Sequence, residues 1–186
     1  ITSPGRYING YHGYNRSSRH RWLDLDKIVW KYKKKCWQNT QISVIAPSKW
    51  MANCAKNSVL FKNYPIQVIP NGININRYKP IDQSVSREVL GIPQDTLLLL
   101  FGAVSPTKSE IKGSHLLKEA LIRLKKSNIE QKIALAVFGT EINESLSDFG
   151  FKTYNMGYLH DDYSKSILYS ASNIFLAPSI QDNLPC

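Results

Sequence analysis

Four leucines and a phenylalanine follow one another at residues 97–101, directly before a glycine. A short apolar run without alternation is typical of a strand that is buried on both faces, as in a parallel sheet covered by helices. After it, segments with helical spacing of apolar residues and further short strand-like segments follow along the chain. Helices are predicted over residues 115–126 and from 161 or 162 to 171, and strands over 133–138, 152–156 and 174–178. This order predicts half of a doubly wound α/β sheet.

The first part of the chain predicts a smaller unit of the same kind. Strands are predicted over residues 41–46 and 66–69, with a helix between them that begins after Ser48 and ends near residue 61. Two strands joined by one helix pair in parallel through a right-handed crossover. After the second strand, Asn71 and Gly72 predict a sharp turn, because both residue types tolerate positive φ.

Charge divides the chain near residue 80. Residues 1–80 contain 14 Lys and Arg against two Asp, a net charge of +12, whereas the remainder carries −2. This shift coincides with a polar stretch that contains prolines. We therefore expect a first α/β domain over residues 1–76, a linker over 77–96 with a short helix over 84–90, and a second domain over 97–186. The basic first half favours an anionic partner, such as nucleic acid, a membrane surface or a phosphorylated substrate.

A basic amphipathic helix is predicted over residues 23–38. Two acids stand at its start and lysines gather toward its end, as the helix dipole prefers. Its predicted apolar face consists of Ile28, Val29, Tyr32, Cys36 and Trp37. Two interpretations stay open: the helix lies on an anionic membrane surface, or it packs on a core and exposes an ordinary solvated face.

The two acids at the start of that helix, Asp24 and Asp26, also spell the D-x-D by which one class of glycosyltransferases holds a metal. Their position at a helix start already accounts for both, and the neighbouring lysines would repel a metal, so we do not interpret them as a metal site. Residues 1–22 show neither a helical nor a strand period, which predicts an irregular basic surface segment.

Two loops of the second half are candidate walls of a binding site. Lys112 and Gly113 stand between a predicted strand and the N-terminus of a predicted helix, the arrangement by which α/β proteins hold phosphate. A solvated loop lysine is the alternative interpretation, and the chain contains neither G-x-G-x-x-G nor a Walker A sequence. Asp182 follows the last predicted strand, which we expect to be parallel and buried, and ligands bind at the carboxyl ends of such strands.

Seven sequence blocks occur in an order that resembles one enzyme family. They are I-A-P-S-K-W, V-I-P-N-G-I-N, F-G-A-V followed by Lys112-Gly113, F-G-T, G-Y-L-H-D-D, Y-S-A-S-N-I-F-L-A-P-S and Q-D-N-L-P. Together they resemble the group 1, retaining, nucleotide-sugar glycosyltransferases of the GT-B fold, and most closely the branch acting in exopolysaccharide and colanic acid assembly. The resemblance covers residue 23 to the end. It implies two partial Rossmann-like domains with parallel sheets, joined by a hinge linker.

The resemblance also implies an activity. The family transfers a sugar from a nucleotide-sugar donor, of UDP or GDP type, to a glycan or lipid-linked acceptor in polysaccharide biosynthesis, and it needs neither a metal nor a cofactor. Lys112 matches the lysine that neutralises the donor diphosphate. Asp182 occupies the first acidic position of the E-x7-E motif, whose first member hydrogen-bonds donor sugar hydroxyls. We expect these two residues to be catalytic.

Further residues take their roles from the same resemblance. The donor-binding set also includes Gly102, Ala103, Lys108, Gly139, Met156, Gly157, Tyr158, Leu159, Asn183 and Leu184, and the acceptor side or hinge includes Asn71 and Gly72. Many members have arginine where this chain has Ala103. Lys108 or a longer loop is therefore expected to replace that cation, or donor binding is weaker.

Two departures from the family pattern lead to an interpretation of the chain as a fragment. Asp182 is one methylene shorter than the glutamate of the family, and the second glutamate of the motif would fall beyond Cys186. The expected fragment lacks most of the N-terminal domain and the end of the C-terminal domain. Two other functions stay open: a basic module that binds nucleic acid or an anionic surface, and a non-transferase GT-B enzyme such as a phosphorylase or epimerase.

Location and nucleic-acid binding are also predicted from the sequence. No apolar run approaches the roughly 18 residues that span a bilayer, and the N-terminus lacks the pattern of a signal peptide. We therefore expect a cytoplasmic protein, with its basic half in contact with the inner face of an anionic membrane. Nucleic acid is not an expected partner, because no known nucleic-acid-binding motif is present.

Overall fold

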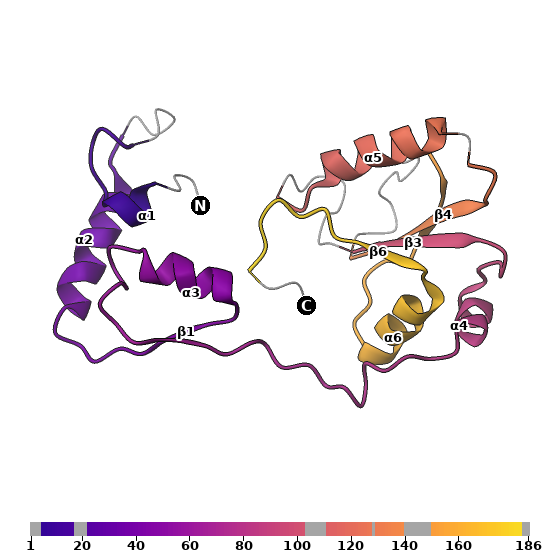
Figure 1. The fold of residues 1–186 in the computed structure, drawn as a ribbon, viewed down its shortest axis with the longest axis horizontal. Coiled ribbons are helices and arrows are strands. Elements are labelled where there is room, and N and C mark those ends of the chain that lie inside the picture. The colour runs from indigo at the N-terminus through magenta and orange to yellow at the C-terminus, as the bar shows by residue number, and fades with distance from the viewer. Residues whose placement is uncertain (1–4, 17–21, 103–110, 128, 140–149, 184–186) are drawn as a thin grey trace. The chain divides into compact units, whose positions relative to one another are not determined.

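The chain forms two compact units, each with its own parallel sheet. The structure, a computed structural model, describes residues 5–16, 22–102, 111–127, 129–139 and 150–183. One unit comprises Ile1–Gly72 with Asn183–Cys186, and the other comprises Ile73–Asp182. Both units contain helices and strands (Figure 1). Every strand pair of the described residues is parallel. The predicted α/β class is therefore confirmed.

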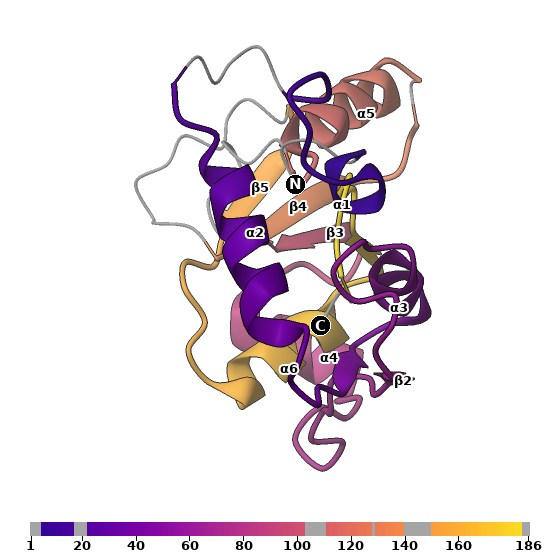
Figure 2. The ribbon, with the colours of Figure 1, turned by 90° about the vertical axis from the view of Figure 1, so that its left-hand side faces the viewer.

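The first unit is built around a two-stranded sheet. Its elements are α1 (Arg6–Asn9), α2 (Leu25–Trp37), β1 (Val44–Ala46), α3 (Lys49–Lys56) and β2 (Ile66–Val68). Figure 2 labels α1, α2, α3 and β2. Strands β1 and β2 pair in parallel, with Ala46 opposite Val68. The hydroxyl of Ser48 accepts a hydrogen bond from the amide of Met51 at 3.2 Å and so caps α3. The predicted crossover and its cap are confirmed, although α3 ends earlier than residue 61.

Arg6 overturns the prediction of an irregular basic surface segment at the N-terminus. The residue lies in α1 and is only 3% exposed. Its guanidinium donates two hydrogen bonds to Asp24, at 2.5 and 3.2 Å, and one to Asn15 at 3.2 Å, and it lies 3.6 Å from a carboxylate oxygen of Asp26. Five N–H donors in a planar fork allow an arginine to be buried in this way. Both acids of the D-x-D therefore bind an arginine, and Asp24 also caps α2 as predicted.

Helix α2 presents a different face to the first unit than its spacing predicts. Trp30 stacks on Tyr11 and Trp37 stacks on Phe61, each pair with ring centroids 5.6 Å apart. The predicted apolar face is largely exposed, with Ile28, Val29 and Tyr32 at 48%, 48% and 70%, and Cys36 is exposed as well. Trp37 is the one member of the predicted face that packs inward. None of the helices that the structure describes is long and apolar enough to span a bilayer.

The second unit is a four-stranded parallel sheet with helices on both faces (Figure 1). Its elements are α4 (Gln83–Leu90), β3 (Leu97–Gly102), α5 (Ser114–Lys126), β4 (Ile133–Phe138), β5 (Lys152–Asn155), α6 (Asp162–Ala171) and β6 (Ile174–Leu176). The strand order is β5-β4-β3-β6. Asp161 caps α6 by accepting a hydrogen bond from the amide of Ser164 at 2.8 Å, which decides between the two predicted starts at 161 and 162.

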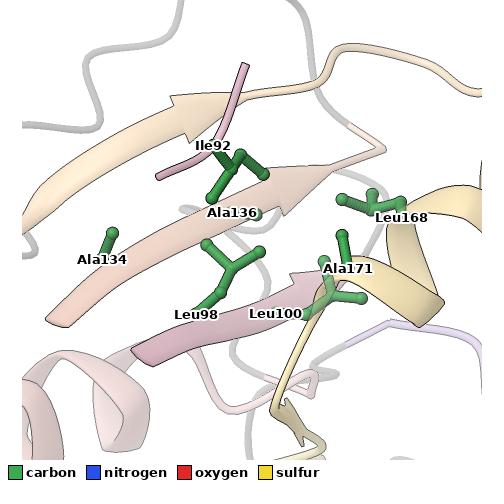
Figure 3. Packing of buried hydrophobic residues seen from close by; sticks show 7 residues of the cluster. All are labelled: Ile92, Leu98, Leu100, Ala134, Ala136, Leu168 and Ala171. Carbon is green, nitrogen blue, oxygen red and sulfur yellow. The ribbon is translucent and has the colours of Figure 1, made fainter. Parts of the chain in front are cut away.

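Alternate residues of β3 enter two separate hydrophobic layers. Leu99 and Phe101 pack with Leu117 and Leu121 of α5 on one face of the sheet. On the other face, Leu98 and Leu100 belong to the layer drawn in Figure 3, whose other members are Ile92, Ala134, Ala136, Leu168 and Ala171. The prediction that residues 97–101 are buried on both faces is confirmed, since all but Leu97 are at most 4% exposed.

Three predictions about connecting segments and edges differ from the structure. Strand β6 is parallel but not buried: it pairs with β3 alone, and Ile174 and Phe175 are 46% and 45% exposed. It is the edge strand of the described sheet, so half of its backbone has no strand beside it. Gly72 has no positive φ and no turn forms there. The expected linker over 77–96 contains α4, which packs against α6 and so belongs to the second unit.

Candidate functional site

The strand order creates a point where the chain reverses direction across the sheet. From β3 the chain passes through α5 to β4 and β5 on one side, and then through α6 to β6 on the opposite side of β3. The hydrophobic layers place α5 on one face and α6 on the other. In doubly wound sheets the loops on either side of such a switch point diverge and leave a crevice at the carboxyl ends of the strands, which is where ligands bind. The switch point here lies between β3 and β6.

Two segments far apart in the sequence meet at this switch point. The amide of Ile180 donates a 2.9 Å hydrogen bond to the carbonyl oxygen of Ile111. The ammonium of Lys112 lies 2.7 Å from a carboxylate oxygen of Asp182. The structure therefore brings together the two residues that were predicted from separate motifs as catalytic. Their side chains are 40% and 25% exposed, so water and solutes reach the pair.

Gly113 allows the two segments to approach. It has a φ of +72° and precedes the first residue of α5, and a Cβ atom there would overlap the carbonyl oxygen of Pro178. A larger residue would therefore push the loop after β6 away from the start of α5. The first amides of α5 lie beside Lys112, and amides at a helix N-terminus favour anions. Pattern reasoning identified Gly113 as part of a phosphate motif but missed its contact with Pro178.

Gly102 has a packing role in this structure. It pairs with Phe138 of β4, and a Cβ atom at Gly102 would overlap the Phe138 ring. The ring of Phe138 in turn makes an edge contact with Tyr169, with centroids 6.1 Å apart. Sequence reasoning missed Phe138, because contact with a glycine on the neighbouring strand leaves no local pattern. The role of Gly102 in binding a diphosphate stays a prediction.

The loops after β4 and β5 are joined by their backbones. The amide of Gly139 donates to the carbonyl oxygen of Gly157 at 2.8 Å, and the amide of Gly157 donates to the side-chain oxygen of Asn155 at 3.0 Å. Both glycines have positive φ, at 85° and 61°. Met156 and Leu159 pack against the layer shared with α6, so their side chains belong to the core. Tyr158, at 47% exposure, is the member of this predicted donor loop whose side chain faces water.

The remaining predicted site residues lie outside the described ranges, next to Asp182, or at the end of the first unit. Ala103, Lys108 and Leu184 lie outside the described residues. Asn183 is exposed and directly follows Asp182. Asn71 and Gly72 are exposed at the end of the first unit. Within the described ranges, no group of three or more His, Cys, Asp or Glu is arranged to hold a metal.

Comparison with known proteins identifies the fold. No family model matches the chain, and none of the curated proteins compared with it is similar. Among solved structures, the sucrose-phosphate synthase of Thermosynechococcus elongatus has a TM-score of 0.64 and 19% identity over 92% of this chain and 43% of its own. WaaG, a glycosyltransferase involved in lipopolysaccharide biosynthesis, has a TM-score of 0.61 and 20% identity over 98% of this chain and 49% of its own.

The chain therefore has the fold of a GT-B glycosyltransferase. It spans less than half the length of the two solved structures. At 19% and 20% identity the likeness shows the fold alone, so the roles of the site residues rest on their own geometry. In this fold the switch point between β3 and β6, with Lys112 and Asp182 on its two sides, is the candidate functional site.

Proposed function

We propose that this chain is part of a retaining glycosyltransferase that transfers a sugar from a UDP- or GDP-linked donor to a glycan or lipid-linked acceptor in polysaccharide biosynthesis. The observation that carries the proposal is the 2.7 Å contact between Lys112 and Asp182 across the switch point. These are the two residues that the resemblance implies to be catalytic. The glycosyltransferase fold of the two solved structures supports the same function.

In the proposed reaction, the second unit binds the donor and stabilises the leaving group. Lys112 and the first amides of α5 neutralise the negative charge that grows on the departing diphosphate, which is electrostatic catalysis by groups already in place. Asp182 accepts hydrogen bonds from hydroxyls of the donor sugar. The acceptor attacks from the face that the diphosphate leaves, so the configuration at the anomeric carbon is retained. Lys112 supplies the positive charge, and neither a metal nor a cofactor is part of the proposal.

Replacing Lys112 by alanine in the natural protein tests this assignment. A charge-assisted hydrogen bond contributes about 1.5 to 3 kcal/mol, so Lys112→Ala should weaken binding of the nucleotide-sugar about 10- to 100-fold and lower turnover. Lys126→Ala, at the exposed far end of the same helix, is the matched control and should leave both unchanged. Unaltered donor affinity and turnover in Lys112→Ala would refute the phosphate assignment. Analysis of products from a labelled nucleotide-sugar separates transfer from phosphorolysis and epimerisation.

The first unit is proposed to bind the acceptor and to contact an anionic membrane surface at the cytoplasmic face. Helix α2 exposes Leu25, Ile28, Val29 and Tyr32 on one face. It also carries five lysines, at positions 27, 31, 33, 34 and 35. An exposed apolar face flanked by lysines is the pattern of helices that lie in a bilayer interface. Asn71 and Gly72, next to the boundary between the units, are proposed as hinge residues.

A further inference from the structure

The ion pair between Lys112 and Asp182 carries an inference about how the site distinguishes its donor from its product. A carboxylate oxygen of Asp182 lies 2.7 Å from the ammonium that is proposed to bind the donor diphosphate. Asp182 thus occupies a position at Lys112 that an anion would take. Because the ammonium of Lys112 is a single compact charge, a diphosphate and Asp182 compete for it.

The backbone around this pair does not depend on the pair. The loop after β6 is held against the start of α5 by the 2.9 Å hydrogen bond from Ile180 to Ile111. The close approach of Gly113 and Pro178 holds the same two segments. The two charged side chains are 40% and 25% exposed, and a pair that is partly in water exchanges partners at low cost. The side chains can therefore separate while the two segments stay in contact.

We infer that Asp182 acts as a specificity-determining residue that disfavours the free nucleoside diphosphate relative to the nucleotide-sugar. This inference rests on the proposed function. Either ligand displaces Asp182 from Lys112. A nucleotide-sugar then offers Asp182 the hydroxyls of its sugar as hydrogen-bond donors. A nucleoside diphosphate lacks that donor sugar, and its terminal phosphate adds negative charge beside a carboxylate that has lost its cation. Asp182 therefore promotes release of the product after transfer.

Removing the charge of Asp182 tests the inference. Binding of UDP, GDP, UDP-glucose and GDP-mannose is measured by calorimetry on the natural protein and on Asp182→Asn. For the nucleotide that the protein uses, the variant should bind the diphosphate about five- to tenfold tighter, because a like charge is gone, while affinity for the sugar nucleotide stays equal or falls. Asp182→Glu keeps the charge and should bind the diphosphate as the natural protein does. Glu119→Gln removes an exposed carboxylate from α5 and should change nothing.

The outcomes separate this inference from the proposed function. If Lys112→Ala weakens sugar-nucleotide binding but Asp182→Asn binds the diphosphate no tighter, the inference is wrong and the proposed function stands. If the natural protein binds none of the four compounds, both are wrong.

The gain in affinity for the diphosphate in Asp182→Asn should shrink when Lys112 is replaced as well, because Asp182 and the diphosphate compete for the Lys112 ammonium. An equal gain with and without Lys112 would show a general charge effect and overturn the inference. Thermal unfolding of each variant confirms that it is folded.

Discussion

The carbonyl oxygen of Pro178 lies too close to Gly113 for a Cβ atom to fit at that residue. This close approach joins the loop after β6 to the start of α5, and it holds Lys112 and Asp182 on the two sides of the same switch point. The geometry of the candidate site thus depends on a residue that carries no functional group.

Gly113→Ala should therefore damage both stability and ligand binding. A residue with Cβ at positive φ costs about 1 to 2 kcal/mol, and displacement of Pro178 adds to this. Donor affinity should fall as well, because Asp182 moves with the loop. Gly91→Ala is the control: Gly91 also has a positive φ, of 65°, but nothing lies within 4 Å of its Cβ position. It should lose stability in chemical denaturation and keep donor affinity, and a similar loss of affinity in both variants would contradict this account.

Removing the buried guanidinium of Arg87 should strongly reduce the stability of the second unit. It is 3% exposed and donates to the carbonyl oxygens of Ala171 and Gln94 and to the side-chain oxygen of Asn173. Arg87→Met keeps the apolar stem but leaves buried acceptors without that donor, so we expect a loss of about 3 kcal/mol in the free energy of unfolding. Arg123→Met, exposed in the last turn of α5, should change it by less than about 0.5 kcal/mol in the same denaturation experiment.

Tyr78 and Asp162 should make the stability of the second unit depend on pH at both extremes. The tyrosine hydroxyl donates a 2.8 Å hydrogen bond to Asp162, and Arg77 adds another at 3.2 Å. The bonds from Tyr78 and Arg77 lower the pKa of Asp162. The bond to Asp162, together with burial, raises the pKa of Tyr78. The contribution of Asp162 is present above its unfolded pKa of about 4 and is lost as pH falls through its lower folded pKa.

The raised pKa of Tyr78 makes stability depend on pH in the opposite direction. Its contribution is complete below the unfolded pKa of about 10 and is lost as pH rises through the higher folded pKa. The difference in unfolding free energy between the natural protein and Tyr78→Phe should therefore be constant between about pH 5 and 9 and shrink on either side. Tyr163→Phe, at a tyrosine 66% exposed on α6, should follow the natural protein throughout. A Tyr78→Phe curve parallel to that of the natural protein would contradict the prediction.

Lysines of α2 should dominate binding to anionic vesicles. Each basic residue near the headgroups contributes about 1 kcal/mol, so replacing Lys33, Lys34 and Lys35 by glutamine should weaken sedimentation with phosphatidylserine vesicles about 100-fold. The control replaces three other exposed lysines of the first unit, Lys49, Lys56 and Lys62. Equal losses in both triple variants, or binding to an oligonucleotide in place of vesicles, would argue against a membrane role for α2.

Much of the fold could be predicted from the sequence because its signals are local. The run of leucines at residues 97–101 and the similar run over 133–138 predict strands that the structure contains almost residue for residue. Asp24 and Ser48 predict helix starts, and each caps the helix that follows it. The start predicted at Asp161 or Asp162 is capped by Asp161. Burial on both faces and side-chain capping act within a few residues, so a single stretch of sequence is enough to determine them.

The faces of α2 and the burial of Arg6 could not be predicted in this way. Apolar spacing places Ile28, Val29 and Tyr32 on one stripe, but the stripe that packs inward carries Trp30 and Trp37, because Tyr11 and Phe61 offer them rings to stack on. Arg6 is buried because Asp24 accepts two of its hydrogen bonds. Asp24 lies 18 residues further along the chain. Spacing within one helix contains no information about such partners.

The sequence by itself determined that this protein is an α/β chain with parallel strands, and that Lys112 and Asp182 each follow a strand. Only the tertiary structure decided that they meet. Strand order is set by the packing of helices on the two faces of the sheet, and it places β6 beside β3, so that residues 70 positions apart form an ion pair. Contacts of that kind depend on the sum of long-range packing, which no local pattern encodes.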